Sequence, residues 1–138
     1  MDGVGIVLSL LEEDAGILAL IDMDAIPSRL AGGVLTATVA LPALSVTEIS
    51  SVDRNIPDPA VKRHVRQRIQ VTGIAATYPA VKGLLAAVKT ACADKMPADG
   101  SLTEITVHTD GAGPDMYDED LDAYVKTQDF LVRYNEVR

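Results

Sequence analysis

The two histidines are the side chains best suited to acid–base or metal chemistry, and the chain has no others beyond His64 and His108. His64 lies within a run of basic residues, whereas His108 lies in a segment with the alternation of a strand. Neither has a second histidine, a cysteine or a carboxylate at the spacing of a metal site. We therefore expect both histidines to be solvated and expect no metal centre.

A hydrolase would need a serine or cysteine nucleophile beside a histidine and an acid, which can come together only in space. The Gly-x-Ser-x-Gly motif is absent from the chain. Cys92 is the single cysteine, which excludes an internal disulfide and a cysteine-based zinc site and suits a reducing compartment. We expect no catalytic residues and no enzymatic activity. A small hydrolase that uses His64 or His108 stays open as the third hypothesis.

A glycine-containing segment at residues 111–114 superficially resembles a phosphate-binding loop. It lacks the third glycine and a following Lys-Ser/Thr pair, and the acids that come after it would repel phosphate. Interpreted as a calcium loop that begins at Asp110, it would place Ala112 and Pro114 where oxygen ligands belong. We expect no cofactor here, and only adventitious cation binding stays open.

Two oppositely charged stretches are the remaining candidates for a site. The first holds Lys62, Arg63, His64, Arg66 and Arg68, and the second holds Asp115, Asp118, Glu119, Asp120 and Asp122. The ordinary interpretation of the first is a solvated entry to a strand. The alternative is that Lys62, Arg63, Arg66 and Arg68 of one copy face the five acids of another. Complementary patches on one chain suit a head-to-tail interface between subunits, which can close into a ring.

Composition limits the class of protein. The length of 138 residues suits one domain over 1–138, and 48% apolar with 23% charged residues indicates a globular chain. The net charge of −8 opposes general nucleic-acid binding. No apolar run is long enough to span a bilayer, and the first residues lack the basic start of a secretory signal. We expect no membrane association and a protein that stays where it is made.

Hydrophobic spacing predicts the elements that must position these side chains. Apolar residues at three- and four-residue spacing predict a helix over 4–20, and residues 34–39 favour extended structure. Leu44 and Val46 alternate with polar residues as in a half-buried strand. Residues 50–60 are rich in Ser, Asp, Asn and Pro and are predicted to form a loop.

The second half of the chain has a clearer pattern. Alternation predicts strands around 68–72, 104–108 and 124–134, and Gly73 marks a bulge or a close backbone approach. A stripe at helical spacing predicts a helix at about 79–95, and residues 110–122 are predicted to be a long connection. The order favours an α+β fold, with a mainly antiparallel, mixed sheet of about four strands packed by the two helices.

Several segments resemble a known family. They are residues 41–46 (LPALSV), 66–71 (RQRIQV), 75–78 (AATY) before an alanine-rich helix, and 129–134 (DFLVRY). In this arrangement after an N-terminal helix, they resemble the tail completion or tail terminator proteins of long-tailed bacteriophages. The resemblance covers most of the chain and is weakest between residues 22 and 39.

The resemblance implies a structural role without catalytic residues. Members of the family that the chain resembles form hexameric rings at the head-proximal end of the tail tube. These rings stop tube polymerisation and join the tail to a head connector or stopper protein. DNA would pass through the ring without specific binding. The protein would occur in the host cytoplasm during assembly and then at the tail-neck junction of the virion. Gene transfer agents and tailocins use similar parts.

A different class of protein stays open beside this one. A small ligand-binding or regulatory α+β domain would give much the same pattern of elements. It predicts a concave apolar pocket with converging polar groups, and a monomer or dimer in solution.

Overall fold

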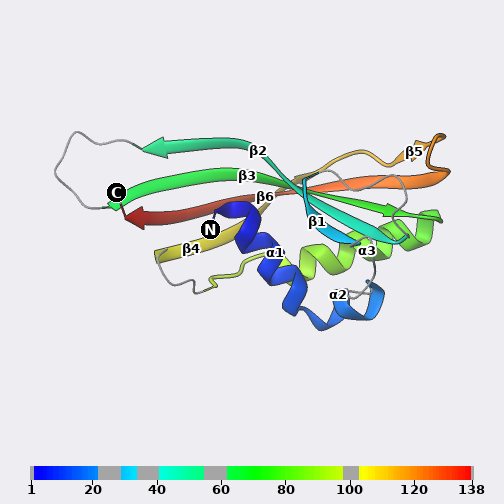
Figure 1. Ribbon diagram of the computed structural model, residues 1–138, viewed down its shortest axis with the longest axis horizontal. Coiled ribbons are helices and arrows are strands. Elements are labelled where there is room, and N and C mark those ends of the chain that lie inside the picture. The colour runs from blue at the N-terminus through cyan, green and yellow to red at the C-terminus, as the bar shows by residue number, and fades with distance from the viewer. Residues whose placement is uncertain (1, 22–28, 34–40, 55–61, 98–102, 138) are drawn as a thin grey trace.

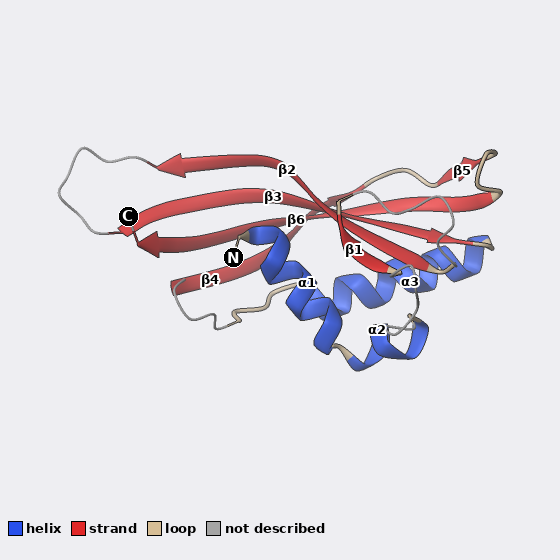
Figure 2. Cartoon of the chain, viewed as in Figure 1, coloured by secondary structure: helices blue, strands red, loops and turns tan. Residues whose placement is uncertain are grey.

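The computed structural model describes residues 2–21, 29–33, 41–54, 62–97 and 103–137. In these ranges a six-stranded sheet has the order β1-β2-β3-β6-β4, with β5 paired to the end of β6. The strands are β1 (Leu30–Gly32), β2 (Ala43–Arg54), β3 (Lys62–Ala75), β4 (Thr103–Ala112), β5 (Met116–Asp118) and β6 (Ala123–Val137). The helices are α1 (Gly3–Glu13), α2 (Ala15–Leu20) and α3 (Tyr78–Cys92), and they lie on one side of the sheet (Figures 1 and 2).

The predicted fold class is confirmed, because every described strand pair except β1 with β2 is antiparallel. The centre of the sheet is the long ladder between β3 and β6, which pairs Lys62 with Val137 at one end and Ala75 with Tyr124 at the other. The four predicted strands correspond to β2, β3, β4 and β6. The two strands that were not predicted, β1 and β5, have three residues each.

The core lies between this sheet and α1 and α3. Alternate residues of the two central strands point to the helices, as predicted from their two-residue spacing. The largest fully buried side chains include Ile69 and Val71 of β3, Phe130 of β6, Leu11 of α1 and Leu84 of α3. The sheet therefore has one face covered by helices, and we call the other its open face.

The single helix predicted over 4–20 is wrong, since two helices meet at Asp14. The backbone of Asp14 is extended there, with φ −80° and ψ 126°, which ends α1. Its carboxylate accepts a hydrogen bond from Ile17 N at 3.1 Å and so caps the start of α2. A capping acid at the end of the acidic interruption of the apolar stripe, residues 12–14, thus breaks the helix.

Helix α1 is fixed to the sheet at its first residue. Gly3 N donates to Gln67 Oε1 at 2.6 Å, and the Gln67 amide donates to Glu48 Oε1 at 2.8 Å. A side chain at Gly3 would collide with Gln67 and with Ile69. The absence of a side chain at Gly3 therefore lets the helix start approach β3 closely.

Helix α3 confirms the predicted core stripe, with Val81, Leu84, Leu85, Val88 and Cys92 all buried. It ends at Cys92 rather than at 95, because the backbone of Ala93 is extended with φ −65° and ψ 134°. Gly73 is a close approach rather than a bulge, since a Cβ there would overlap Leu85. None of the described helices is both long enough and apolar enough to cross a membrane.

Two predicted connections contain strand. Residues 50–54, expected in a loop, continue β2, and a bulge between Glu48 and Ser50 lets the ladder with β3 resume. The predicted connection at 110–122 holds the end of β4 and all of β5. The prediction of loops was wrong because it relied on polar composition. These strand segments are exposed, and backbone pairing holds them in the sheet. The extended segment at 34–39 and residues 55–60 of the predicted loop lie outside the described residues.

Candidate functional site

The strand geometry divides the predicted basic run between the two faces of the sheet. Arg63 lies on the helix side, where Nη1 is 3.8 Å from Glu136 Oε1 and 3.9 Å from Asp53 Oδ2. Arg66 and Arg68 lie on the open face, because successive side chains of a strand alternate. Lys62 begins β3, and its side chain is not among those described. The run therefore does not form one continuous cationic patch.

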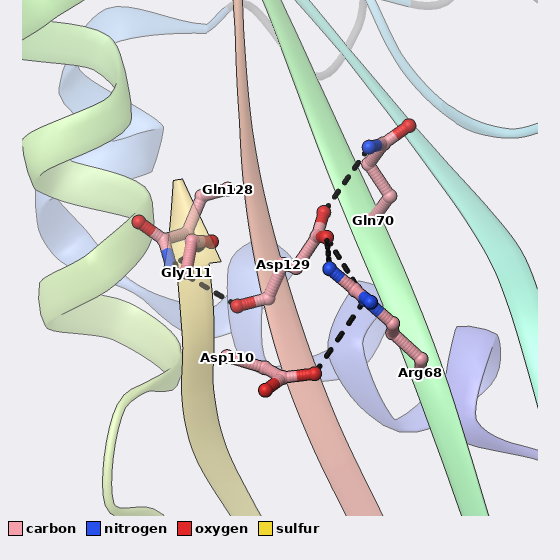
Figure 3. Close-up of polar contacts among 6 residues, drawn as sticks. All are labelled: Arg68, Gln70, Asp110, Gly111, Gln128 and Asp129. Carbon is pink, nitrogen blue, oxygen red and sulfur yellow. Dashed lines mark hydrogen bonds and ion pairs between the residues drawn. The ribbon is translucent and has the colours of Figure 1, made fainter. Parts of the chain in front are cut away.

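Arg68 is held by carboxylates of its own chain (Figure 3). Its Nη2 and Nε lie 2.6 Å and 3.0 Å from Asp129 Oδ2, and Nε lies 3.5 Å from Asp110 Oδ2. Gln70 Nε2 donates to the other oxygen of Asp129 at 3.1 Å. The hydrogen bond to Asp129, with its charge, raises the pKa of the Arg68 guanidinium. Arg68 thus serves the sheet itself, and it is a weaker candidate for binding a partner.

Arg66 and Arg133 form an exposed pair of like charges. They are direct cross-strand partners in the ladder of β3 and β6, so both side chains stand on the open face. Neither makes an ion pair or a side-chain hydrogen bond with any residue that the structure describes. Like charges directly opposite each other weaken a sheet. Among the described residues, the arginine pair is therefore a site of positive charge without a carboxylate partner.

The two histidines are both exposed and partnered. His64 Nδ1 lies 3.0 Å from Asn135 Oδ1, and His108 Nδ1 lies 3.3 Å from Asp94 Oδ1. Sequence spacing gave no sign of the Asp94 contact. No group of three or more potential metal ligands occurs in the described part of the chain.

The predicted acidic stretch forms a hairpin tip between β5 and β6. We call residues 115–122 the acidic tip. Asp118 Oδ1 accepts from the backbone of Asp120 at 2.9 Å and of Leu121 at 3.3 Å, which shapes the turn. Asp122 accepts a hydrogen bond from the Tyr117 hydroxyl, and this raises the pKa of Tyr117.

Asp115 is neutralised within the chain. It accepts from Lys126 Nζ and from the Tyr78 hydroxyl, each at 2.8 Å. These hydrogen bonds, that from Lys126 foremost, lower the pKa of the Asp115 carboxyl. The side chains of Glu119 and Asp120 have no such partner among the described residues. They are the acids of the tip that remain available to another molecule.

Large apolar and aromatic side chains accompany the acids at the tip. Met116, Tyr117 and Leu121 are 46%, 49% and 43% exposed. Tyr117 packs edge to face on Tyr124, with ring centres 5.1 Å apart. Exposed aromatic and apolar residues with charges at their rim are typical of protein interfaces.

An apolar groove lies nearby between α2, α3 and the start of β2. Its volume is about 330 Å³, and its lining residues are Leu20, Pro42, Pro79, Ala80, Gly83 and Leu84. No polar side chain of the described residues lines it. The ligand-binding alternative predicted polar groups converging on a pocket, and this groove does not have them.

The glycine-containing segment serves the sheet. Gly111 has φ 98°, and its carbonyl accepts from Gln128 Nε2 at 3.0 Å (Figure 3). Gly113 N donates to Thr127 O at 2.9 Å. The segment bends the chain from β4 toward β5.

Three contributors to these surfaces were not predicted from the sequence, namely Arg133, Val52 and the tyrosine cluster of Tyr78, Tyr117 and Tyr124. Alternation with Phe130 and Val132 could have placed Arg133 on the open face. Its pairing with Arg66 depends on strand register, which the pattern does not determine.

Comparisons with known proteins bear on the fold. No family model and no curated protein sequence matches the chain. Among solved structures, the fold is similar to a chain of the "Virion of native gene transfer agent (GTA) particle", with a TM-score of 0.63. The similarity covers 94% of this chain and 91% of that one, at 18% sequence identity. The two chains share a fold over nearly their whole lengths.

Proposed function

We propose that the chain is a structural protein of a phage-like particle that closes the head-proximal end of a tail tube. Copies would form a ring, taken as hexameric from the family resemblance, that ends tube polymerisation and joins the tail to the head connector or stopper. The observation that carries this proposal is the shared fold with a virion chain over 94% of the present chain.

The sequence supports the proposal independently of that comparison. The segments at 41–46, 66–71, 75–78 and 129–134 resemble tail terminator proteins. The first leads into β2, the second lies on β3, the third connects β3 to α3, and the fourth lies on β6. One domain suffices for such a role, which requires no catalytic groups. A net charge of −8 suits a ring through which DNA passes without being held.

Deletion of the gene from its native genome tests the role directly. A tail-end protein predicts particles with unjoined heads and tails, together with tubes of abnormal length in electron micrographs. Supplying the wild-type gene on a plasmid should restore joined particles. Joined particles with tails of normal length in the deletion strain would contradict the proposal.

A biochemical test uses purified chain and the tail tube protein encoded in the same genome. Added during tube polymerisation, the chain should shorten the mean tube length, and a gold label on it should mark one tube end. Labelling along the tube, or no effect on length at a tenfold molar excess of the chain, would contradict an end-capping role.

A further inference from the structure

The arginine pair and the acidic tip lie at opposite ends of the sheet. Arg133 pairs with Arg66 toward the end of the sheet at which β2 ends, β3 begins and β6 ends. Strand β5 pairs with β6 at the opposite end, beside Tyr124. At a rise of roughly 3.3 Å per residue, the stretch of β6 between Tyr124 and Arg133 spans about 30 Å. Figure 1 shows β5 at one end of the molecule and the C-terminus at the other. The two surfaces of one copy are therefore too far apart to contact each other.

The arginine pair has an apolar neighbour. Val52 is the cross-strand partner of Arg66 in β2, so it shares the open face, and it is 61% exposed. The surface thus combines an exposed aliphatic side chain with two guanidinium groups that have no carboxylate partner in the described ranges. Guanidinium groups bind carboxylates through paired hydrogen bonds.

The acidic tip has the complementary composition. Glu119 and Asp120 offer carboxylates without partners in the described structure, and Tyr117 and Leu121 offer exposed apolar surface beside them. A contact between the two surfaces would bury apolar groups at its centre and neutralise charge at its rim, as protein interfaces do.

We infer that the arginine pair with Val52 on one copy binds the acidic tip of the next copy, so that copies associate head to tail. The inference rests on the proposed function, because it names the contact by which copies of a tail-end protein would join. A contact between two different surfaces repeats from copy to copy and closes into a ring when the rotation allows.

Charge reversal and charge exchange test the inference. The variants are Arg66→Glu/Arg133→Glu, Glu119→Arg/Asp120→Arg, and the chain that carries all four changes. Sedimentation equilibrium at low salt, at chain concentrations up to about 1 mM, measures self-association of each. Each double variant should associate at least about tenfold more weakly than wild type, and the fourfold variant should regain most of the loss.

A matched control for Arg66→Glu/Arg133→Glu is Lys89→Glu/Lys95→Glu, which makes the same charge change at exposed positions on and after α3. It should associate as wild type does. Circular dichroism and urea midpoints identify any variant that fails to fold. The fourfold variant keeps the test decisive, because restored association cannot come from a damaged fold.

Three outcomes would overturn the inference. They are a wild-type chain that stays monomeric at 1 mM, double variants that associate as wild type does, and a fourfold variant without recovery. Loss of binding to a double-stranded DNA fragment in Arg66→Glu/Arg133→Glu, with self-association unchanged, would assign the arginine pair to nucleic acid instead. If the charge-reversal variants still form rings that cap tubes as wild type does, this contact would be refuted while the proposed function would stand.

Discussion

Phe130 and Leu131 are adjacent on β6 and show how differently the two faces of the sheet are used. Phe130 is fully buried under the helices, whereas Leu131 is partly exposed on the open face among charged and polar neighbours. The helix face carries the apolar core and determines the fold. The open face adds little to the core, and it carries most of the charged side chains of the central strands.

The open face is itself divided by what its charges contact. Arg68 is neutralised by Asp129 and Asp110 of its own sheet. Arg66, two residues away on the same face, lies opposite Arg133 and has no carboxylate partner in the described structure. Charges of the first kind stabilise the chain, and charges of the second kind are suited to binding another molecule.

The largest expected effect separates the two faces. Phe130→Ala should lower the free energy of unfolding by about 3–5 kcal/mol, because it leaves a cavity in the core. Leu131→Ala, one residue along, should cost less than about 1 kcal/mol. Urea denaturation measures both. Equal losses would show that the open face is buried in the isolated protein.

The second-largest expected effect on the free energy of unfolding comes from the contacts of Arg68 with Asp129 and Asp110. Asp129→Asn removes the charge that two Arg68 nitrogens contact, and it should lower the free energy of unfolding more than the same change at Asp110. Asp110→Asn, the exposed partner at 3.5 Å, should cost less than about 1 kcal/mol. Urea midpoints of the two variants give the comparison. A loss at Asp110 that matched the loss at Asp129 would contradict the assignment of Asp129 as the main partner.

Two glycines test the packing of α3. Gly73→Ala would push a methyl group into Leu85 and should cost about 1–3 kcal/mol. Gly83→Ala on the exposed side of α3 has no atom within 4 Å of the new Cβ and should stabilise by about 0.5–1 kcal/mol. The sign of the change in melting temperature should therefore differ between the two variants. A destabilised Gly83→Ala would indicate that this side of α3 is covered.

The smallest effect concerns pH at the acidic tip. Because the folded-state pKa of Asp115 is lowered, its contribution is present above the ordinary aspartate pKa and is lost as pH falls through the folded value. The urea midpoint of wild type should thus fall slightly more between pH 6 and pH 3 than that of Asp115→Asn. Identical pH profiles would show that the bonds to Lys126 and Tyr78 do not form in solution.

Sequence patterns predicted the helix face better than the open face. The buried alternation on β3 and β6 and the stripe on α3 follow from burial, which repeats at a fixed period. Polar strand ends at residues 50–54 and 116–118 carry no such period, since only backbone pairing holds them. The basic run and the acidic tip were predicted as charged stretches. Their division into neutralised and available charges depends on register and face, which a linear pattern does not contain.

Cross-linking between copies tests the head-to-tail account most directly. Cys92 is buried, and burial raises the pKa of its thiol to about 12, so wild type should give no cross-links under mild oxidation. Val52→Cys and Leu121→Cys place new thiols on the two surfaces. Within one copy these positions are too far apart for a disulfide.

A mixture of the two single variants should give covalent dimers under mild oxidation, and the double variant should give a ladder of multimers. Low salt should increase both yields. Monomers alone in both samples, or dimers from each single variant by itself as readily as from the mixture, would contradict head-to-tail association through these surfaces.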